Sequence, residues 1–238
     1  MTISFGHETR KQWIGEIARR TGGQVYQGPF KGMKLIHEAN WGDGDTASKF
    51  LGMYEDELYP YVEQALATNP DLIINFGCAE GYYGIGCAMR TGSSTILIDI
   101  DATTLGLAEQ NAKINNISNI EFTTDNSITK FQNSLASASN PFVVMDCEGY
   151  EDTILNVDLV PALAKTTVLV ESHDCNVPGI TDRLIARLST THDVVKIKQG
   201  AKNPYIDVID DISDEFKWLL CCEFRPSTMY WLYLVPKK

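Results

Sequence analysis

Acidic side chains and one imidazole gather in two short stretches of this chain, each directly after an apolar run. They are Asp146, Glu148, Glu171, His173 and Asp174. A positioned imidazole or carboxylate can take the proton of a hydroxyl group, and the ordinary pKa of histidine, about 6.5, suits that task. We therefore predict His173 as a catalytic base, with Glu148 or Glu171 orienting its ring.

The same acidic residues have two other interpretations. Like charges at close range can recruit a cation, so Asp146, Glu171 and Asp174 could bind a magnesium ion that lowers the pKa of a hydroxyl group. Alternatively, Glu148 and Glu151 cap a short helix and Glu171 makes a structural hydrogen bond. The structural alternative is as strong as the catalytic one for each residue alone, and weaker for the whole cluster.

A second candidate site is a turn between an apolar run at residues 72–74 and a helix expected at residues 82–90. Its residues are Asn75, Phe76, Gly77, Cys78, Ala79, Glu80 and Gly81. Gly77 lets the chain turn sharply, and Gly81 lets a helix and a ligand approach the backbone. The N–H groups at the start of the helix can then bind a polar group. A glycine turn alone is a weak signal, because a tight strand-to-helix connection also favours glycine.

Asp99 strengthens that signal, because it lies 22 residues after Gly77. A spacing of roughly 20 residues places a carboxylate within reach of ribose hydroxyls in a strand–helix–strand unit. Asp101 fits the alternative role of helix cap better. Together, the turn and Asp99 predict an adenosine-containing cofactor. Gly84 keeps NAD open, whereas S-adenosylmethionine tolerates Ala79 in the middle of the turn and has no pyrophosphate.

The composition limits the partners of this 238-residue chain, which is long enough for a large α/β domain. The net charge of −11 repels phosphate backbones and anionic membranes, so we expect neither nucleic acid nor membrane partners. The six cysteines form no CxxC pair, so we expect reduced thiols in a cytoplasmic protein. We expect no signal peptide or membrane span. The sequence does not indicate the oligomeric state.

The elements that must position these residues alternate between strands and helices. Apolar runs predict strands at residues 72–74, 94–98, 119–123, 142–145, 167–170, 193–198 and 229–235. Intervening helices imply a mostly parallel sheet covered on both faces. Ligands of such sheets bind beyond the carboxyl ends of the strands, where five successive strands here end in polar residues.

The first 50 residues carry no motif that we can assign. We expect a helix at residues 7–20, two short strands flanking residues 28–32, and a loop that contains Trp41. A loop at residues 200–211 could cover the site. Five aromatic residues could line a pocket or simply pack in the core: Trp41, Tyr54, Tyr82, Tyr83 and Tyr150.

Four stretches of the chain resemble the FkbM family of S-adenosylmethionine-dependent methyltransferases. They are LGMYEDEL at residues 51–58, the glycine turn, MDCEGYE at residues 145–151 and VESH at residues 170–173. That family has a GxYE-type lead-in, a glycine turn without the middle glycine, a D-x-E-G-x-E segment and an E-x-H segment. The resemblance spans residues 51–174, and the D-x-E-G-x-E segment is its most specific part.

The resemblance implies a Rossmann-like class I methyltransferase fold, an α/β fold with helices on both faces of its sheet. That sheet has seven mostly parallel strands, of which the last is antiparallel. The resemblance also implies methylation of a hydroxyl group, often on a sugar or another secondary metabolite, with S-adenosylmethionine as cofactor. Residues 51–238 would form the methyltransferase domain, and residues 1–50 a small N-terminal cap.

The resemblance also assigns residues to parts of the cofactor. The glycine turn would surround the methionine part, Asp99 the ribose, Asp125 and Asn126 the adenine, and Asp146 the amino group and sulfonium. Asn75 stands where many class I enzymes have an acidic residue, so Glu55 or Asp146 would supply the missing charge. The complete set expected to bind the cofactor is Glu55, Asn75, Phe76, Gly77, Cys78, Glu80, Gly81, Asp99, Ile100, Asp125, Asn126 and Asp146.

Two alternatives stay open at this point. An NAD-linked oxidoreductase could use the same turn, although the chain has no visible Tyr-x-x-x-Lys pair and the acidic cluster has no role in hydride transfer. A non-catalytic nucleotide-binding module would bind the cofactor without turnover.

Overall fold

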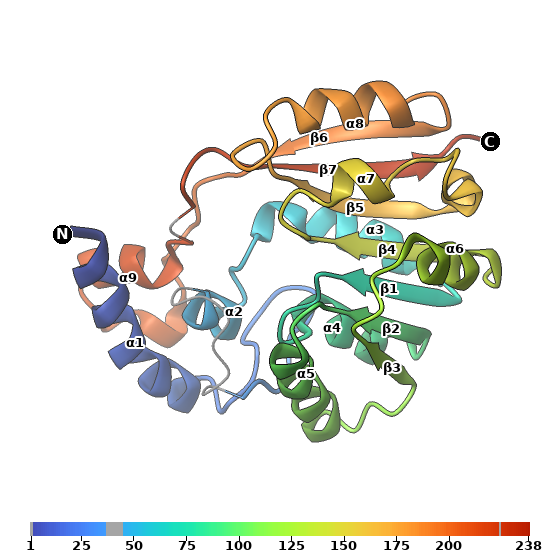
Figure 1. Ribbon diagram of the computed structural model, residues 1–238. Helices are drawn as coiled ribbons and strands as arrows, with labels where there is room; N and C mark the ends of the chain where they lie inside the picture. The colour runs from blue at the N-terminus through green and yellow to red at the C-terminus, as the bar shows by residue number, and fades with distance from the viewer. Residues whose placement is uncertain (1, 37–44, 224) are drawn as a thin grey trace.

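A computed structural model describes residues 2–36, 45–223 and 225–238, and its centre is a seven-stranded sheet (Figure 1). The strands are β1 Leu72–Phe76, β2 Ser94–Ile98, β3 Ile120–Thr123, β4 Pro141–Met145, β5 Thr167–Ser172, β6 His192–Lys198 and β7 Tyr230–Pro236. They lie in the order β3-β2-β1-β4-β5-β7-β6. Strands β1 to β5 pair in parallel, whereas β7 is antiparallel to β5 and β6. The predicted Rossmann-like sheet with an antiparallel last strand is confirmed.

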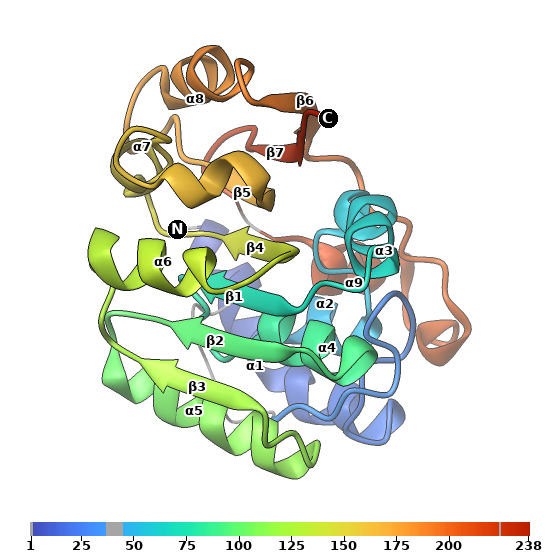
Figure 2. The ribbon, with the colours of Figure 1, turned by 90° about the vertical axis from the view of Figure 1, so that its right-hand side faces the viewer.

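Helices cover both faces of the sheet (Figure 2). They include α3 Tyr59–Ala67, α4 Tyr82–Thr91 and α5 Ala102–Ile114 on one side, and α6 Ile128–Ala136, α7 Glu151–Ile154 and α8 Ile180–Leu188 on the other. Short 3-10 turns are η1 Asp56–Leu58, η2 Pro161–Lys165 and η3 Asp207–Ile209. In β1, Ile73 packs in one core and Ile74 in the other. Central strands are apolar along their length because both faces are buried.

Two of the strands are longer at their carboxyl ends than predicted. Asn75 and Phe76 complete β1, where Asn75 pairs with Leu97 of β2 and is buried. Glu171 and Ser172 likewise extend β5 and pair with β7. The predicted strands ended just before their first polar residue, but Asn75, Glu171 and Ser172 each have a hydrogen-bond or ion-pair partner within the fold.

A helical lobe lies beyond the carboxyl ends of β1 and β4 (Figure 1). It consists of α1 Thr2–Arg20, α2 Thr46–Leu51 and α9 Asp214–Cys221, which contact one another. The rings of Trp13 and Phe216 lie 5.5 Å apart, and Arg20 forms a 2.5 Å ion pair with Asp211. The first helices of the chain therefore pack against a helix from its last quarter.

The rest of the N-terminal region contains little regular structure. An isolated antiparallel bridge between Gln24 and Lys34 replaces the two predicted strands. Trp41 and its predicted loop lie outside the described residues. None of the helices in the described ranges has the length and apolarity that a membrane crossing needs.

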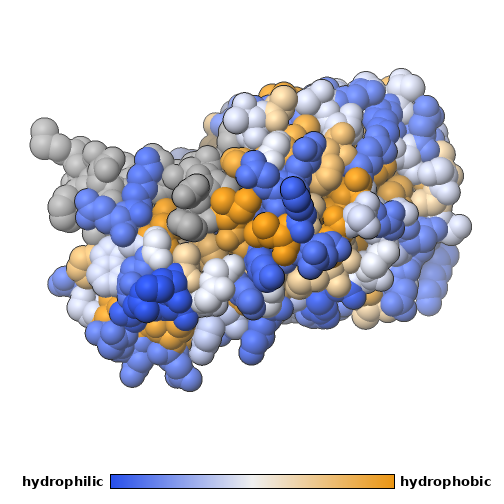
Figure 3. Space-filling model, turned by 90° about the horizontal axis from the view of Figure 1, so that it is seen from below, coloured by the Kyte–Doolittle hydropathy of each residue, from blue (hydrophilic) through white to orange (hydrophobic). Residues whose placement is uncertain are grey.

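The surface at the β3 edge of the sheet is mostly hydrophilic, with hydrophobic residues gathered in a band across its middle (Figure 3). In the described part of the chain, the large apolar side chains that are most exposed are Ile100, Leu159, Val195, Tyr205, Trp218 and Val235. Some exposed apolar side chains are normal for a folded protein. Ile100 and Trp218 differ because each lines a cavity.

Candidate active site

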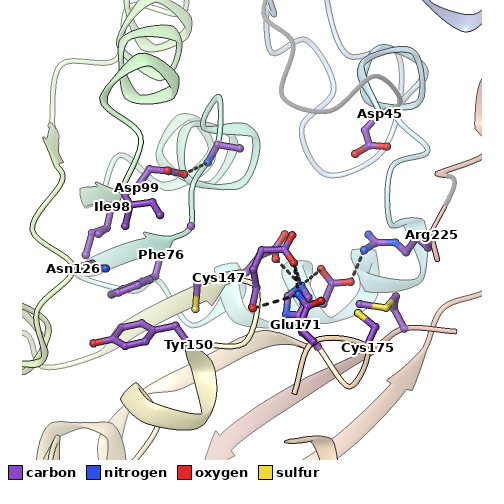
Figure 4. A pocket seen from close by; sticks show the side chains of 18 of the residues that line it. Asp45, Phe76, Ile98, Asp99, Asn126, Cys147, Tyr150, Glu171, Cys175 and Arg225 are labelled. Carbon is purple, nitrogen blue, oxygen red and sulfur yellow. Dashed lines mark hydrogen bonds and ion pairs between the residues drawn. The ribbon is translucent and has the colours of Figure 1, made fainter. Parts of the chain in front are cut away.

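A cavity of about 630 Å³ opens where the carboxyl ends of β1, β2, β4 and β5 meet (Figure 4). Its volume lies within the range of roughly 300–1,000 Å³ that is usual for small-molecule sites. Nine of the residues predicted for the site line it: Phe76, Gly77, Asp99, Ile100, Asn126, Asp146, Glu148, Glu171 and His173. The structure thus brings the polar ends of consecutive strands together.

The glycine turn follows β1 and contacts the residues that follow β4, and Gly77 lines the cavity there. Gly77 has a φ of +71°, and a Cβ at this position would lie 1.6 Å from the carbonyl oxygen of Asp146. The N–H groups of Gly77 and Cys78 both donate to the carbonyl of Ile98, at 2.8 and 3.1 Å. Glycine at position 77 is therefore what allows the turn to lie directly against Asp146.

Asp99 connects the turn to the end of β2. Its Oδ2 accepts a hydrogen bond from the Ala79 N–H at 2.9 Å, and its Oδ1 accepts one from the Asp101 N–H at 3.0 Å. Each carboxylate oxygen has a further lone pair that can accept from a ligand hydroxyl. Asp101 caps α5 by accepting from the Thr103 N–H at 2.8 Å. Asp99 is therefore the ligand-facing member of this pair.

The end of the cavity next to β2 is apolar. Phe76, Ile98 and Tyr150 line this end, and Asn126 adds an amide (Figure 4). The rings of Phe76 and Tyr150 lie 6.1 Å apart with planes inclined by 30°. This arrangement suits a flat ring with polar atoms on its edge.

The other half of the cavity contains His173, which is 3% exposed and surrounded by four carboxylates. Its Nδ1 lies 3.0 Å from Glu151, and its Nε2 lies 3.3 Å from Asp146 and 3.6 Å from both Glu148 and Glu171. Burial alone would lower the pKa of His173, but the hydrogen bonds with Asp146 and Glu151 raise it to about 11. His173 is therefore an imidazolium at neutral pH. In this state it has no lone pair with which to take a proton.

Glu151 positions His173, although the sequence suggested only a helix-capping role. Its fully buried carboxylate also accepts hydrogen bonds from the Cys147 N–H at 2.9 Å and the Gly149 N–H at 2.8 Å. These bonds hold a loop in which Glu148 has a φ of +56°. The sequence signal for this positioning role was that Glu151 is the last residue of the D-x-E-G-x-E segment.

Arg225 closes the end of the cavity opposite the apolar half (Figure 4). It forms ion pairs with two buried carboxylates, Glu55 and Glu171, and a third with Glu223 at 3.1 Å. Burial and the charge of Asp146 raise the pKa of Glu171 well above its usual range. Burial also raises the pKa of Glu55 to about 7. The sequence offered no signal for Arg225, because no motif covers that region.

Seven predicted residues do not line the cavity: Glu55, Asn75, Cys78, Glu80, Gly81, Asp125 and Asp174. Glu55 instead accepts from the Tyr83 hydroxyl at 2.5 Å and pairs with Arg225. The side chain of Asn75 faces α4, where its Oδ1 accepts from the Gly84 N–H at 2.9 Å. Asn75 therefore supports the start of a helix.

The remaining members of that set also have local roles. Cys78 is buried, and Gly81 starts α4 with a φ of +86°. Glu80 forms a buried ion pair with Lys49 of α2, and Lys49 itself lines the cavity. Asp125 is exposed and accepts from the Ser127 N–H at 3.0 Å, just before α6.

The residues predicted for magnesium do not form a ligand set that fits this ion. Asp174 accepts a hydrogen bond from the Thr181 hydroxyl and does not line the cavity that holds Asp146 and Glu171. Ligand atoms of Asp146, Glu151 and His173 lie within 4.8 Å of one another. However, Mg²⁺ prefers oxygen ligands, whereas His173 would offer a nitrogen ligand to this group.

The predicted aromatic wall is only partly present. Tyr54 and Tyr150 line the cavity. Tyr82 and Tyr83 are buried, with ring centroids 5.3 and 5.9 Å from that of Phe30. They are packing residues between α4 and the N-terminal region.

Several solved structures that share this fold are methyltransferases. An rRNA methylase from Streptococcus thermophilus aligns with a TM-score of 0.51 and 11% identity, over 78% of this chain and 99% of its own. Precorrin-6y C5,15-methyltransferase from Geobacter metallireducens gives 0.50 and 9%, over 76% and 88%. A SAM-dependent methyltransferase from Agrobacterium tumefaciens gives 0.50 and 9%, over 77% and 63%.

At these identities the likeness defines the fold, which is that of class I methyltransferases. Neither a protein-family model nor a curated protein sequence matches the chain. The resemblance to the FkbM family, which is more specific than the shared fold, is therefore not supported by either of these two comparisons.

Proposed function

We propose that this protein is an S-adenosylmethionine-dependent O-methyltransferase of the FkbM type, acting on a hydroxyl group of a small molecule or sugar. The observation that carries the proposal is the division of the cavity into two halves. One half combines Gly77, Asp99 and apolar walls, and the other presents acidic side chains around His173. The shared fold and the sequence resemblance support the same function.

The first half fits the adenosyl part of the cofactor. Asp99 would accept from the ribose hydroxyls, since each of its oxygens keeps a lone pair. Ile98 and Ile100 would flank the adenine with Asn126 at its edge. Asp146 adjoins the glycine turn and would balance the cationic methionine part of the cofactor.

S-Adenosylmethionine supplies a methyl group on a positively charged sulfur, which is already a good leaving group. The residues of the chain therefore need mainly to align the acceptor hydroxyl and to remove its proton. We assign proton removal to Glu171, because its carboxylate lines the cavity and forms an ion pair with Arg225 that fixes its position. The positive charge of His173 offsets the repulsion among the carboxylates around it.

The NAD-linked alternative has less support. Its extra glycine, Gly84, serves packing, because a Cβ there would lie 3.1 Å from side-chain atoms of both Asn75 and Leu97. The sheet order also differs from that of dinucleotide-binding folds, which is 3-2-1-4-5-6. Here the last strand, β7, is antiparallel, as the resemblance to methyltransferases implies, and it lies between β5 and β6.

Calorimetry with S-adenosylmethionine, S-adenosylhomocysteine and NAD tests the cofactor. We expect both adenosyl ligands to bind and NAD to show no heat. Asp99→Asn should weaken S-adenosylhomocysteine binding by about 10- to 100-fold, because it removes a charged acceptor of hydrogen bonds. Asp125→Asn is the matched control and should leave binding unchanged, since Asp125 does not line the cavity. Tight NAD binding, or an unaffected Asp99→Asn variant, would contradict the proposal.

Transfer of a labelled methyl group to a panel of sugars and hydroxylated natural products tests turnover. Glu171→Gln should lower the rate by about 100-fold or more, since it removes the base, while S-adenosylhomocysteine affinity stays within twofold. A non-catalytic binding module would instead give no transfer to any member of the panel.

A further inference from the structure

We propose that a second cavity beside Arg225 is an extension subsite for the methyl acceptor, and that it binds an uncharged, hydroxyl-bearing unit against Trp218. This inference rests on the proposed function. The second cavity has a volume of about 440 Å³. Its lining includes Gln199, Lys202, Trp218, Cys222, Glu223 and Arg225.

The two cavities share a wall. Arg225 lines both of them and lies at the end of the first cavity that is opposite the apolar, cofactor-like half (Figure 4). The Gln199 N–H donates to the carbonyl of Met229 at 3.1 Å, and Met229 also lines the first cavity. Because Arg225 lines both cavities, the two sites adjoin, and an acceptor with its hydroxyl near Glu171 would follow the Arg225 side chain to reach the second cavity.

The charges around the second cavity favour an uncharged ligand. The buried ammonium of Lys202 pairs with Asp56 at 2.9 Å, Glu223 at 3.0 Å and Glu57. Arg225 likewise has three carboxylate partners. Because carboxylates already surround both cations, a phosphate or carboxylate on the ligand would gain little attraction and would meet net negative charge.

The side chains of the second cavity offer one flat apolar face and several polar groups. Trp218 is 45% exposed, and its ring meets that of Tyr205 edge to face at 6.3 Å. The Tyr205 hydroxyl donates to Asp214 at 2.6 Å, which helps to fix the pair. Gln199 adds an amide group, whereas the buried Glu223 carboxylate is already bound by Lys202, Arg225 and the Glu55 N–H. A pyranose ring has the matching properties, with a C–H face to stack on an indole and hydroxyls around its edge.

Two exposed cysteines can report on the two cavities separately. Cys222 lines the second cavity and Cys175 the first. With S-adenosylhomocysteine bound, iodoacetamide labelling of each thiol is followed by peptide mass spectrometry. The probes are neutral trisaccharides of glucose, galactose and mannose, the three monosaccharides, and a trisaccharide of galacturonic acid.

We expect at least one neutral trisaccharide to slow labelling of Cys222 by fivefold or more. The matching monosaccharide and the galacturonic acid trisaccharide should not slow the labelling of Cys222. Trp218→Phe should keep this protection because it keeps a flat ring, whereas Trp218→Ala should abolish it. Leu159→Ala, which also truncates an exposed apolar side chain, is the control and should behave as wild type.

Failure of every neutral trisaccharide to protect Cys222, or protection that survives Trp218→Ala, would overturn the extension subsite. If S-adenosylhomocysteine still binds in that case, the proposed function stands and the subsite alone fails. Absence of S-adenosylhomocysteine binding would instead overturn the proposed function and, with it, the acceptor role of the second cavity.

Discussion

His173 owes its charge to its neighbours. A histidine in water loses its proton at a pH of about 6.5, but hydrogen bonds to Asp146 and Glu151 raise the pKa of His173 to about 11 against the effect of burial. The residue type alone favours a base, while the surrounding carboxylates favour a cation. The same shift links the stability of the protein to pH.

The folded-state pKa of His173 lies above the unfolded value, so its contribution to stability is complete below pH 6.5 and declines as the pH rises toward 11. The decline is up to about 1.4 kcal/mol per pH unit. Between pH 7 and 8.5, we expect wild type to lose about 2 kcal/mol more unfolding free energy than His173→Gln. Urea unfolding at both pH values measures this difference. Equal losses in the two proteins would show that His173 is not held as a cation.

Sequence reasoning found the site residues whose positions follow a local rule. Gly77 and Asp99 obey the spacing of a strand–turn–helix–strand unit, and both line the cavity. Arg225 follows no such rule. Arg225 meets Glu171 across 54 positions and Glu55 across 170, so their pairing depends on tertiary structure alone.

At the scale of elements, the contact between β1 and β4 depends on Gly77. We expect Gly77→Ala to cost about 2–4 kcal/mol in unfolding free energy, because its methyl group would collide with the Asp146 carbonyl. S-Adenosylhomocysteine binding should also be lost. The control is Gly106→Ala in α5, where the added methyl group meets no atom within 4 Å. Because alanine favours helix more than glycine does, this variant should gain about 0.5–1 kcal/mol in unfolding free energy. Denaturant unfolding and calorimetry of both variants check this; a stable Gly77→Ala protein would contradict it.

The ion pair of Lys49 and Glu80 joins α2 of the helical lobe to the glycine turn. Both side chains are less than 10% exposed, so Lys49→Met would leave a buried charge and should cost about 3–5 kcal/mol. The double variant Lys49→Met, Glu80→Gln should recover much of that loss, because no charge then lacks a partner. A double-mutant cycle from urea unfolding measures the coupling, and additive losses would mean that the pair does not couple the elements.

The fold was predictable because the same pattern, an apolar run followed by a helical segment, is repeated along the chain. Apolar runs separated by helical segments define the buried strands, and β2 was predicted at Ser94–Ile98, as observed. The predictions stopped too early where buried strands end in polar residues. Asn75 and Glu171 belong to strands because Gly84 and Arg225 satisfy them, and neither partner is adjacent in the sequence.

At the scale of the whole molecule, the net charge of −11 leads us to expect that this chain does not bind RNA. One protein of the same fold is an rRNA methylase, but a strongly acidic chain repels a phosphate backbone. We expect no retention of 16S or 23S rRNA in filter binding at about 50 mM salt with protein at about 10 μM, conditions that favour electrostatic binding. Binding that weakens steeply with added salt would reveal a basic patch and contradict this expectation.

The placement of β7 between β5 and β6 has a consequence for protein synthesis. Strand β6 leaves the ribosome before β7 and has no neighbour in the sheet until β7 inserts beside β5. Arg225, which precedes β7, also emerges late. A nascent chain stalled before residue 225 would therefore expose an unpaired strand edge, the kind of surface that chaperones and aggregating chains recognise.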